Sequence, residues 1–167
     1  MLRYYFALLF SSSVFATTAA AEYIYTIAGC EYSVAFPAAP EIKTLFTSAT
    51  SKKDSANYAG ESYILRAECT DIERVAGDRE IIKGQVIEYA EQNGLQNPIF
   101  EFADGPLGYM ARVKGYKNIG GLQGTFVAVA YVGRTSTLML YTGSPSASYP
   151  QDGVYTFMNS VKFKPAQ

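Results

Sequence analysis

Alternating apolar and polar positions in the second half of the chain predict three consecutive β-strands, at 107–117, 122–132 and 135–142. Side chains on a strand point to opposite faces in turn. In the segment 125–132 both sets of alternate positions are apolar, which is typical of a strand covered on both faces. We therefore expect 122–132 to lie inside a sheet rather than at its edge.

The preceding strand has two different faces. Tyr109, Ala111 and Val113 share one face, whereas Met110, Arg112 and Lys114 share the other. Such alternation is typical of an antiparallel strand with one buried and one wetter side. The sequence therefore predicts a sheet whose covering is incomplete over this strand.

Glycines mark the two turns between these strands. Gly133-Arg134 predicts a two-residue type II′ hairpin, which would require a positive φ at Gly133. The segment 118–121, followed by Gly124, has the glycine content of a phosphate-binding loop. A phosphate loop leads from a strand into a helix, whereas this segment leads from strand to strand, so we interpret it as a turn.

Three further strands are predicted nearer the N-terminus, at 31–36, 41–47 and 58–69, with a polar loop at 48–57. A proline-containing corner, Phe36-Pro37-Ala38-Ala39-Pro40, separates the first two. If the three strands form a simple meander, the first and third run in the same direction.

A change of apolar period predicts a helix over 71–93, with Asp71 as N-cap and Asn93-Gly94 as the C-terminal stop. Its apolar stripe comprises Ile72, Val75, Ile82, Val86 and Tyr89, flanked by Ala76 and Ala90. A short strand at 98–103 and a loop at 143–150 are predicted next. A short helix at 151–160, with Val154, Phe157 and Met158 facing inward, and a strand at 161–163 complete the chain.

Composition favours one domain. The chain has 167 residues, 49% hydrophobic and 17% charged, which suffices for a single core. Its net charge of −1 and a pI of about 5.5 give no nucleic-acid footprint. We expect one domain at 22–167, without internal repeats or a linker.

Residues 1–21 have the pattern of a secretory signal peptide. Arg3 supplies the positive start, an apolar stretch follows, and three alanines precede Glu22. We expect a bacterial periplasmic or secreted protein that begins near Glu22. The alternative is an uncleaved N-terminal anchor. No later segment is long enough to predict a transmembrane helix.

Cys30 and Cys69 are the two cysteines. In an oxidising compartment we expect them to form a disulfide, although the simple meander would place them at opposite ends. Two alternatives stay open: free thiols, or a lipid anchor at Cys30, because Ile27-Ala28-Gly29-Cys30 resembles a lipobox.

The residue types limit catalysis. Because the chain has no histidine, a Ser–His or Cys–His pair and a His-ligated metal are excluded. Two cysteines are too few for a four-cysteine zinc site. Carboxylate pairs remain as candidates, for example Glu101 with Asp104 or Asp71 with Glu73. We expect no enzyme activity, no cofactor and no metal.

Tyrosine is the conspicuous residue type, with fourteen residues in a chain that lacks tryptophan. Aromatic packing within a sheet explains many of them. Tyrosine also suits binding surfaces, because it joins apolar area to a hydroxyl. The candidates for an exposed binding patch, chosen because they lie near loops or helix ends, are Tyr116, Tyr141, Tyr149 and Tyr155.

The order of elements resembles a known family. The 36–40 corner, the amphipathic helix, the antiparallel run and the closing segment Phe157-Met158-Asn159-Ser160-Val161-Lys162-Phe163 are similar to those of PsbP-like proteins, which include bacterial DcrB-like periplasmic proteins. The resemblance implies an α+β fold, with an antiparallel sheet flanked by one long helix and one short C-terminal helix. It also implies binding or assembly rather than catalysis.

These observations lead to one functional expectation and two alternatives. We expect an exported, non-enzymatic binding or assembly protein of the bacterial cell envelope, whose partner is an envelope protein or a small ligand. The alternatives are an exported carboxylate-based hydrolase and a purely structural envelope component.

Overall fold

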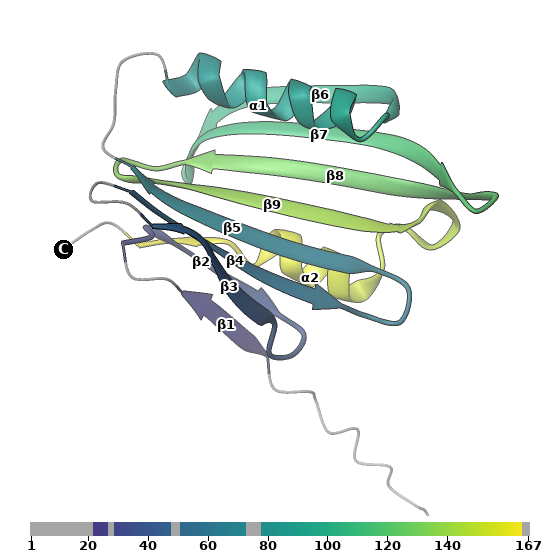
Figure 1. Cartoon of the computed structure of the whole chain (residues 1–167), viewed down its shortest axis with the longest axis horizontal. Coiled ribbons are helices and arrows are strands. Elements are labelled where there is room, and N and C mark those ends of the chain that lie inside the picture. The colour runs from purple at the N-terminus through teal and green to yellow at the C-terminus, as the bar shows by residue number, and fades with distance from the viewer. Residues whose placement is uncertain (1–21, 27–28, 48–50, 73–77, 165–167) are drawn as a thin grey trace, which may run out of the picture.

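The computed structural model describes residues 22–26, 29–47, 51–72 and 78–164. They form one α+β domain with two antiparallel sheets and two α-helices (Figure 1). The predicted signal peptide and the lipobox residues Ile27 and Ala28 lie outside the described residues. Among those described, no helix is long and apolar enough to span a membrane.

The large sheet has seven antiparallel strands in the order β3-β4-β5-β9-β8-β7-β6. Its strands are β3 (Glu41–Thr47), β4 (Ser51–Ala59), β5 (Ile64–Ile72), β6 (Gln96–Gly105), β7 (Gly108–Ile119), β8 (Leu122–Val132) and β9 (Ser136–Pro145). A small sheet has the order β1-β2-β10 and contains β1 (Tyr23–Thr26), β2 (Tyr32–Phe36) and β10 (Lys162–Phe163). The helices are α1 (Asp78–Gln92) and α2 (Asp152–Asn159), with a 3₁₀ turn at Ser146–Ser148.

Helix α1 covers one face of the large sheet along β7 and β8 (Figure 1). It buries Ile82, Val86 and Ala90 against the sheet. The sheet positions beneath it are mostly small and fully buried, including Ala111, Ala128 and Ala130. Small side chains at these positions let the helix lie close to the strands, which is why this segment of the sheet is alanine-rich.

The opposite face is covered by α2 and the small sheet. Phe157 of α2 and Phe36 of β2 are fully buried, with ring centroids 4.8 Å apart. They pack with Leu65 of β5 and with Leu138 and Leu140 of β9. Each fully buried side chain of this size contributes about 1.5–3 kcal/mol. The sheet thus has a core on each side, with β8 in its interior, as the alternation of 125–132 predicts.

The disulfide prediction is confirmed, and the simple meander is wrong. Cys30 and Cys69 are bridged, with their Cα atoms 6.2 Å apart. Strand β2 does not join the large sheet but packs across it, so Cys30 meets the C-terminal part of β5. The extra strand β4 also lies between β3 and β5.

The loop prediction at 48–57 is wrong for the residues that are described. Residues 51–59 form β4, which pairs with both β3 and β5. The segment is polar, yet its side chains find partners: Lys53 pairs with Glu68 at 2.6 Å, and Asn57 donates a hydrogen bond to Ser55. Pairing on both sides therefore outweighs its low apolar content.

The long helix begins later than predicted. It starts at Asp78, and Asp71 is a residue of β5 that pairs with Ser136 of β9 rather than an N-cap. The C-terminal stop is confirmed, because Gly94 has φ +61° and Leu95 N–H donates to Ala90 O. Ile72 belongs to β5, and the expectations for Val75 and Ala76 fall outside the described residues.

The two hairpin turns differ from each other. Gly120 and Gly121 have φ of +58° and +84° in the two-residue loop between Ile119 and Leu122, as a type I′ turn requires. The type II′ prediction at Gly133 is wrong, since this residue lacks a positive φ. Glycine is needed there for space: an added Cβ would lie 2.3 Å from Oε2 of Glu31.

Candidate functional site

A hollow of about 280 Å³ lies between α2 and the large sheet, and we call it the α2 hollow. Strands β7 and β8 supply its floor through Met110, Arg112 and Tyr131. The wall consists of α2 and the loop before it, where Tyr149 precedes Pro150. The hollow exists because α2 has only eight residues and leaves the β7 side of this face open.

Much of the wall is apolar. Val154 of α2 is fully buried, and Met158 on the same helix is half-buried. Met110 and Val129 continue this surface across the floor. Methionine side chains are unbranched and adapt to irregular shapes, so two of them at one hollow suit an apolar group of variable outline.

One cation, Arg112, lines this hollow, and a second, Lys114, lies beside it against the Tyr149 ring. The Arg112 guanidinium is 3.5 Å from the Glu101 carboxylate, and both side chains remain partly exposed. The Lys114 ammonium lies 4.9 Å from the centre of the Tyr149 ring and forms no ion pair with any described carboxylate. Counting Glu101, these charges leave one net positive charge, which favours an anionic group on a ligand.

Burial raises the pKa of the Tyr149 phenol, and the neighbouring Arg112 opposes that shift. Burial likewise raises the pKa of Tyr131, again opposed by Arg112. Both hydroxyls therefore stay protonated at neutral pH, where each donates and accepts hydrogen bonds.

The four predicted tyrosines occupy different places. Tyr149 and Tyr155 line the α2 hollow together, and Tyr155 is 62% exposed. Tyr116 is half-buried on β7 and shares a face with Arg112 and Lys114 but does not line the hollow. Tyr141 lies on the opposite face of the sheet, where its ring is 5.1 Å from that of Tyr89 on α1.

The binding residues expected from the sequence were all tyrosines, so Arg112 and Lys114 were not among them. Their alternation with apolar positions marks the wetter face of 107–117, so the sequence held a signal for them. The sequence held no signal that β7 and α2 would lie at the same hollow, because these segments are about 40 residues apart and meet only through tertiary packing.

The candidate carboxylate pairs do not form a site. Glu101 and Asp104 project from opposite faces of β6, and each lies beside an arginine, Arg112 and Arg79 respectively. Asp71 lies in β5, whereas Glu73 is outside the described residues. Among the residues that are described, no group of three or more Cys, Asp or Glu could hold a metal ion.

Comparisons with known proteins give no family. No family model and no curated protein matches the chain. Among solved structures, LpqN, involved in cell envelope biogenesis of Mycobacterium tuberculosis, is 12% identical with a TM-score of 0.49, over 87% of this chain and 91% of LpqN. A Pseudomonas aeruginosa protein of unknown function, suggested to be a regulator, is 12% identical with a TM-score of 0.41, over 77% of this chain and 86% of its own. Similarity at this level assigns neither family nor function.

Proposed function

We propose that this protein is an exported, non-catalytic binding protein of the cell envelope that binds an amphipathic anion in the α2 hollow. The observation that carries the proposal is the convergence of Tyr149, Tyr155 and Arg112 around one apolar-walled hollow. The apolar wall would receive the body of the ligand. Arg112 would bind its anionic group, since a guanidinium donates several charge-assisted hydrogen bonds to a carboxylate, sulfonate or phosphate.

Location and fold support this proposal. The Cys30–Cys69 bridge is compatible with an oxidising compartment outside the cytoplasm, which agrees with the signal-like pattern of residues 1–21. The resemblance to PsbP-like proteins favours binding or assembly over catalysis. A hydrolase would need two carboxylates in one hollow. Each of five hollows formed by the described residues is lined by at most one.

A matched pair of aromatic probes tests the proposal. Naphthoate and naphthamide share one ring system and differ in charge, so calorimetric titration with both separates the apolar and the anionic contributions. We expect saturable binding, with naphthoate bound about tenfold or more tightly, because a hydrogen bond to a charged group contributes about 1.5–3 kcal/mol. Arg112→Gln should remove this preference, and Tyr155→Ala should weaken the binding of both probes.

Two variants serve as controls. Arg134→Gln removes an exposed arginine that does not line the hollow, and Tyr23→Ala removes a tyrosine of the small sheet. Both should bind the probes as the wild type does. Equal loss in the controls, or no saturable binding by the folded wild type, would contradict the proposal.

A further inference from the structure

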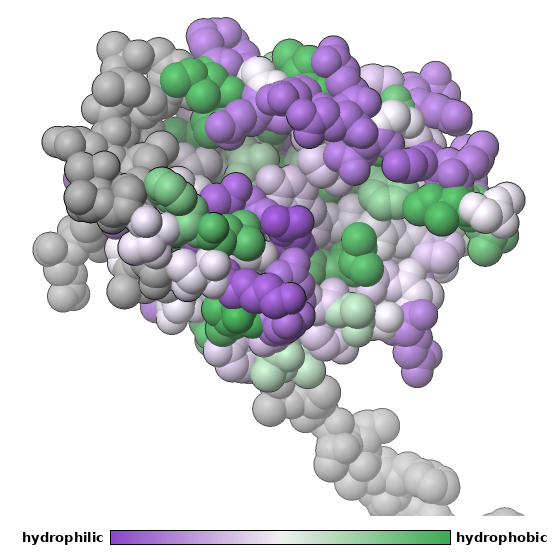
Figure 2. Space-filling view, viewed as in Figure 1, coloured by the Kyte–Doolittle hydropathy of each residue, from purple (hydrophilic) through white to green (hydrophobic). Residues whose placement is uncertain are grey.

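A second hollow lies on the opposite face of the sheet, and we call it the α1 trough. Helix α1 packs over β7 and β8 and reaches β9 through Tyr89, which leaves β5 and β4 uncovered beside it (Figure 1). The trough has a volume of about 270 Å³. In Figure 2 hydrophilic residues gather along α1 and again over the strands below it.

The helix side of the trough is rich in hydrogen-bonding groups. Gln85, Glu88, Tyr89 and Gln92 line it from consecutive turns of α1. The Gln92 amide donates to Glu88 at 2.7 Å, which fixes that pair. Gln85 is exposed, and its amide has no partner among the described residues. An amide both donates and accepts hydrogen bonds, as a ligand hydroxyl does.

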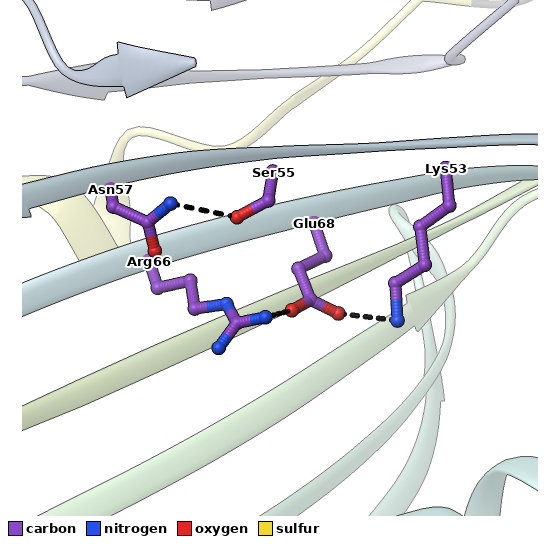
Figure 3. Close-up of polar contacts among 5 residues, drawn as sticks. All are labelled: Lys53, Ser55, Asn57, Arg66 and Glu68. Carbon is purple, nitrogen blue, oxygen red and sulfur yellow. Dashed lines mark hydrogen bonds and ion pairs between the residues drawn. The ribbon is translucent and has the colours of Figure 1, made fainter. Parts of the chain in front are cut away.

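The sheet side is held in place by a buried carboxylate, shown in Figure 3. Glu68 of β5 is 2% exposed and lies between Lys53 of β4 and Arg66 of β5, with Lys53 at 2.6 Å and Arg66 in direct contact. Lys53 also lines the trough, and its ammonium is already paired with Glu68. The Arg66 guanidinium lies over the face of the Tyr141 ring, 5.6 Å from its centre.

Charge and aromaticity define the ligand chemistry. Lys53 and Glu88 are the charged residues that line the trough, they have opposite signs, and each has a partner. The trough therefore offers no net charge to an ion. The rings of Tyr89 and Tyr141 lie 5.1 Å apart and are half-buried. They present apolar area and hydroxyls side by side.

We propose that the α1 trough binds an uncharged, polyhydroxylated ligand, the chemistry of a saccharide. The glutamine amides and tyrosine hydroxyls would bind ligand hydroxyls, and the Tyr89 ring would contact the C–H face of a sugar ring. This site is independent of the α2 hollow, because the sheet separates the two.

Saturation-transfer NMR with maltose, cellobiose, lactose and N,N′-diacetylchitobiose tests the proposal on the intact protein. We expect saturable binding of at least one of these probes and weaker or no binding of gluconate, which carries a carboxylate. Gln85→Ala and Tyr89→Phe should each lower the affinity at least fivefold. Both substitutions retain the helix, because Gln85 is exposed and phenylalanine keeps the Tyr89 ring contact with Tyr141.

Controls address folding and location. Gln123→Ala removes an exposed glutamine on β8 that does not line the trough, and Tyr155→Ala alters the α2 hollow without changing any residue of the trough. Both should retain wild-type saccharide binding. No saturable binding of any neutral probe by the folded wild type, equal binding by Gln85→Ala, or tighter binding of gluconate would each overturn the proposal.

Discussion

The Glu31 carboxylate accepts a 2.8 Å hydrogen bond from the backbone N–H of Thr135, a residue 104 positions away. The same oxygen, Oε2, accepts a second bond from Ser136 N–H at 3.2 Å. Glu31 is 2% exposed and precedes β2, whereas Thr135 lies in the turn between β8 and β9. One buried carboxylate thus ties the small sheet to the hairpin of the large one.

Removing this carboxylate should destabilise the fold. We expect Glu31→Ala to lower the free energy of unfolding by about 2–3 kcal/mol, because two backbone donors lose a charged acceptor in a buried place. Urea denaturation followed by circular dichroism measures the change. Glu41→Ala is the control, since the exposed Glu41–Lys43 pair contributes less than about 1 kcal/mol. Equal effects of the two substitutions would contradict the role given to Glu31.

Two glycine-to-alanine substitutions should act in opposite directions. Gly133→Ala should lower stability by about 1–3 kcal/mol, since its Cβ would lie 2.3 Å from Glu31 Oε2 and 3.0 Å from the Tyr32 hydroxyl. Gly84→Ala should raise stability by about 0.5–1 kcal/mol, because Gly84 lies inside α1 and an added Cβ meets nothing within 4 Å. Thermal unfolding of both variants measures the pair, and a shift in the same direction would refute the prediction.

The buried Glu68 should be more sensitive than its exposed counterparts. Glu68→Gln removes the charge that Lys53 and Arg66 share, and we expect a loss of about 2 kcal/mol. The loss is moderated because both cations are partly exposed and gain hydration. Chemical denaturation measures it, with Glu80→Gln, from an exposed pair on α1, as the control. A change no larger than that of the control would show that the Glu68 contacts contribute little.

Breaking the Cys30–Cys69 bridge should cost about 3–4 kcal/mol in the chain-entropy model, given the sequence separation of 39 residues. The double variant Cys30→Ala, Cys69→Ala removes the bridge and leaves no unpaired thiol. We expect a lower melting temperature than that of the oxidised wild type, and no further decrease on adding reductant. The oxidised wild type should lose stability when it is reduced, and indifference of the wild type to reductant would contradict the bridge.

Alkaline pH should destabilise the protein through Tyr25. Burial, with Asp54 as a secondary cause, raises the pKa of this phenol above its usual value of about 10. Above that pH the unfolded chain loses the proton while the folded protein retains it, so stability falls as pH rises. The Tyr25 hydroxyl is also buried without a hydrogen-bond partner among the described residues. Tyr25→Phe should therefore keep wild-type stability near pH 7 and reduce the loss above pH 10, as denaturation midpoints across this range would measure. An unchanged alkaline slope would contradict the prediction.

The local elements were predictable where one segment carries its own physical reason. The double apolar face of 125–132 requires cover on both sides, and β8 is central. Gly120-Gly121 permits the tight turn, Asn93-Gly94 ends α1, and Val154 and Phe157 are buried under α2. The oxidising compartment expected from the pattern of residues 1–21 also indicated the Cys30–Cys69 bridge.

Only the tertiary structure decided which segments meet. Strand β4 is polar, and its place in the sheet depends on partners in β3 and β5 that local propensity does not report. From the sequence, Gly133 is predicted to be a glycine that a turn requires. In the structure, the Glu31 carboxylate leaves no space for a larger side chain at this position. Tyr149 joins Tyr155 and Arg112 because α2 packs against β5 and β9, beside the open part of β7 and β8. Tyr141 is separated from them by the sheet itself. The alternation of apolar and polar residues shows which side chains share a face of a strand. Which element covers that face depends on contacts between residues far apart in the chain.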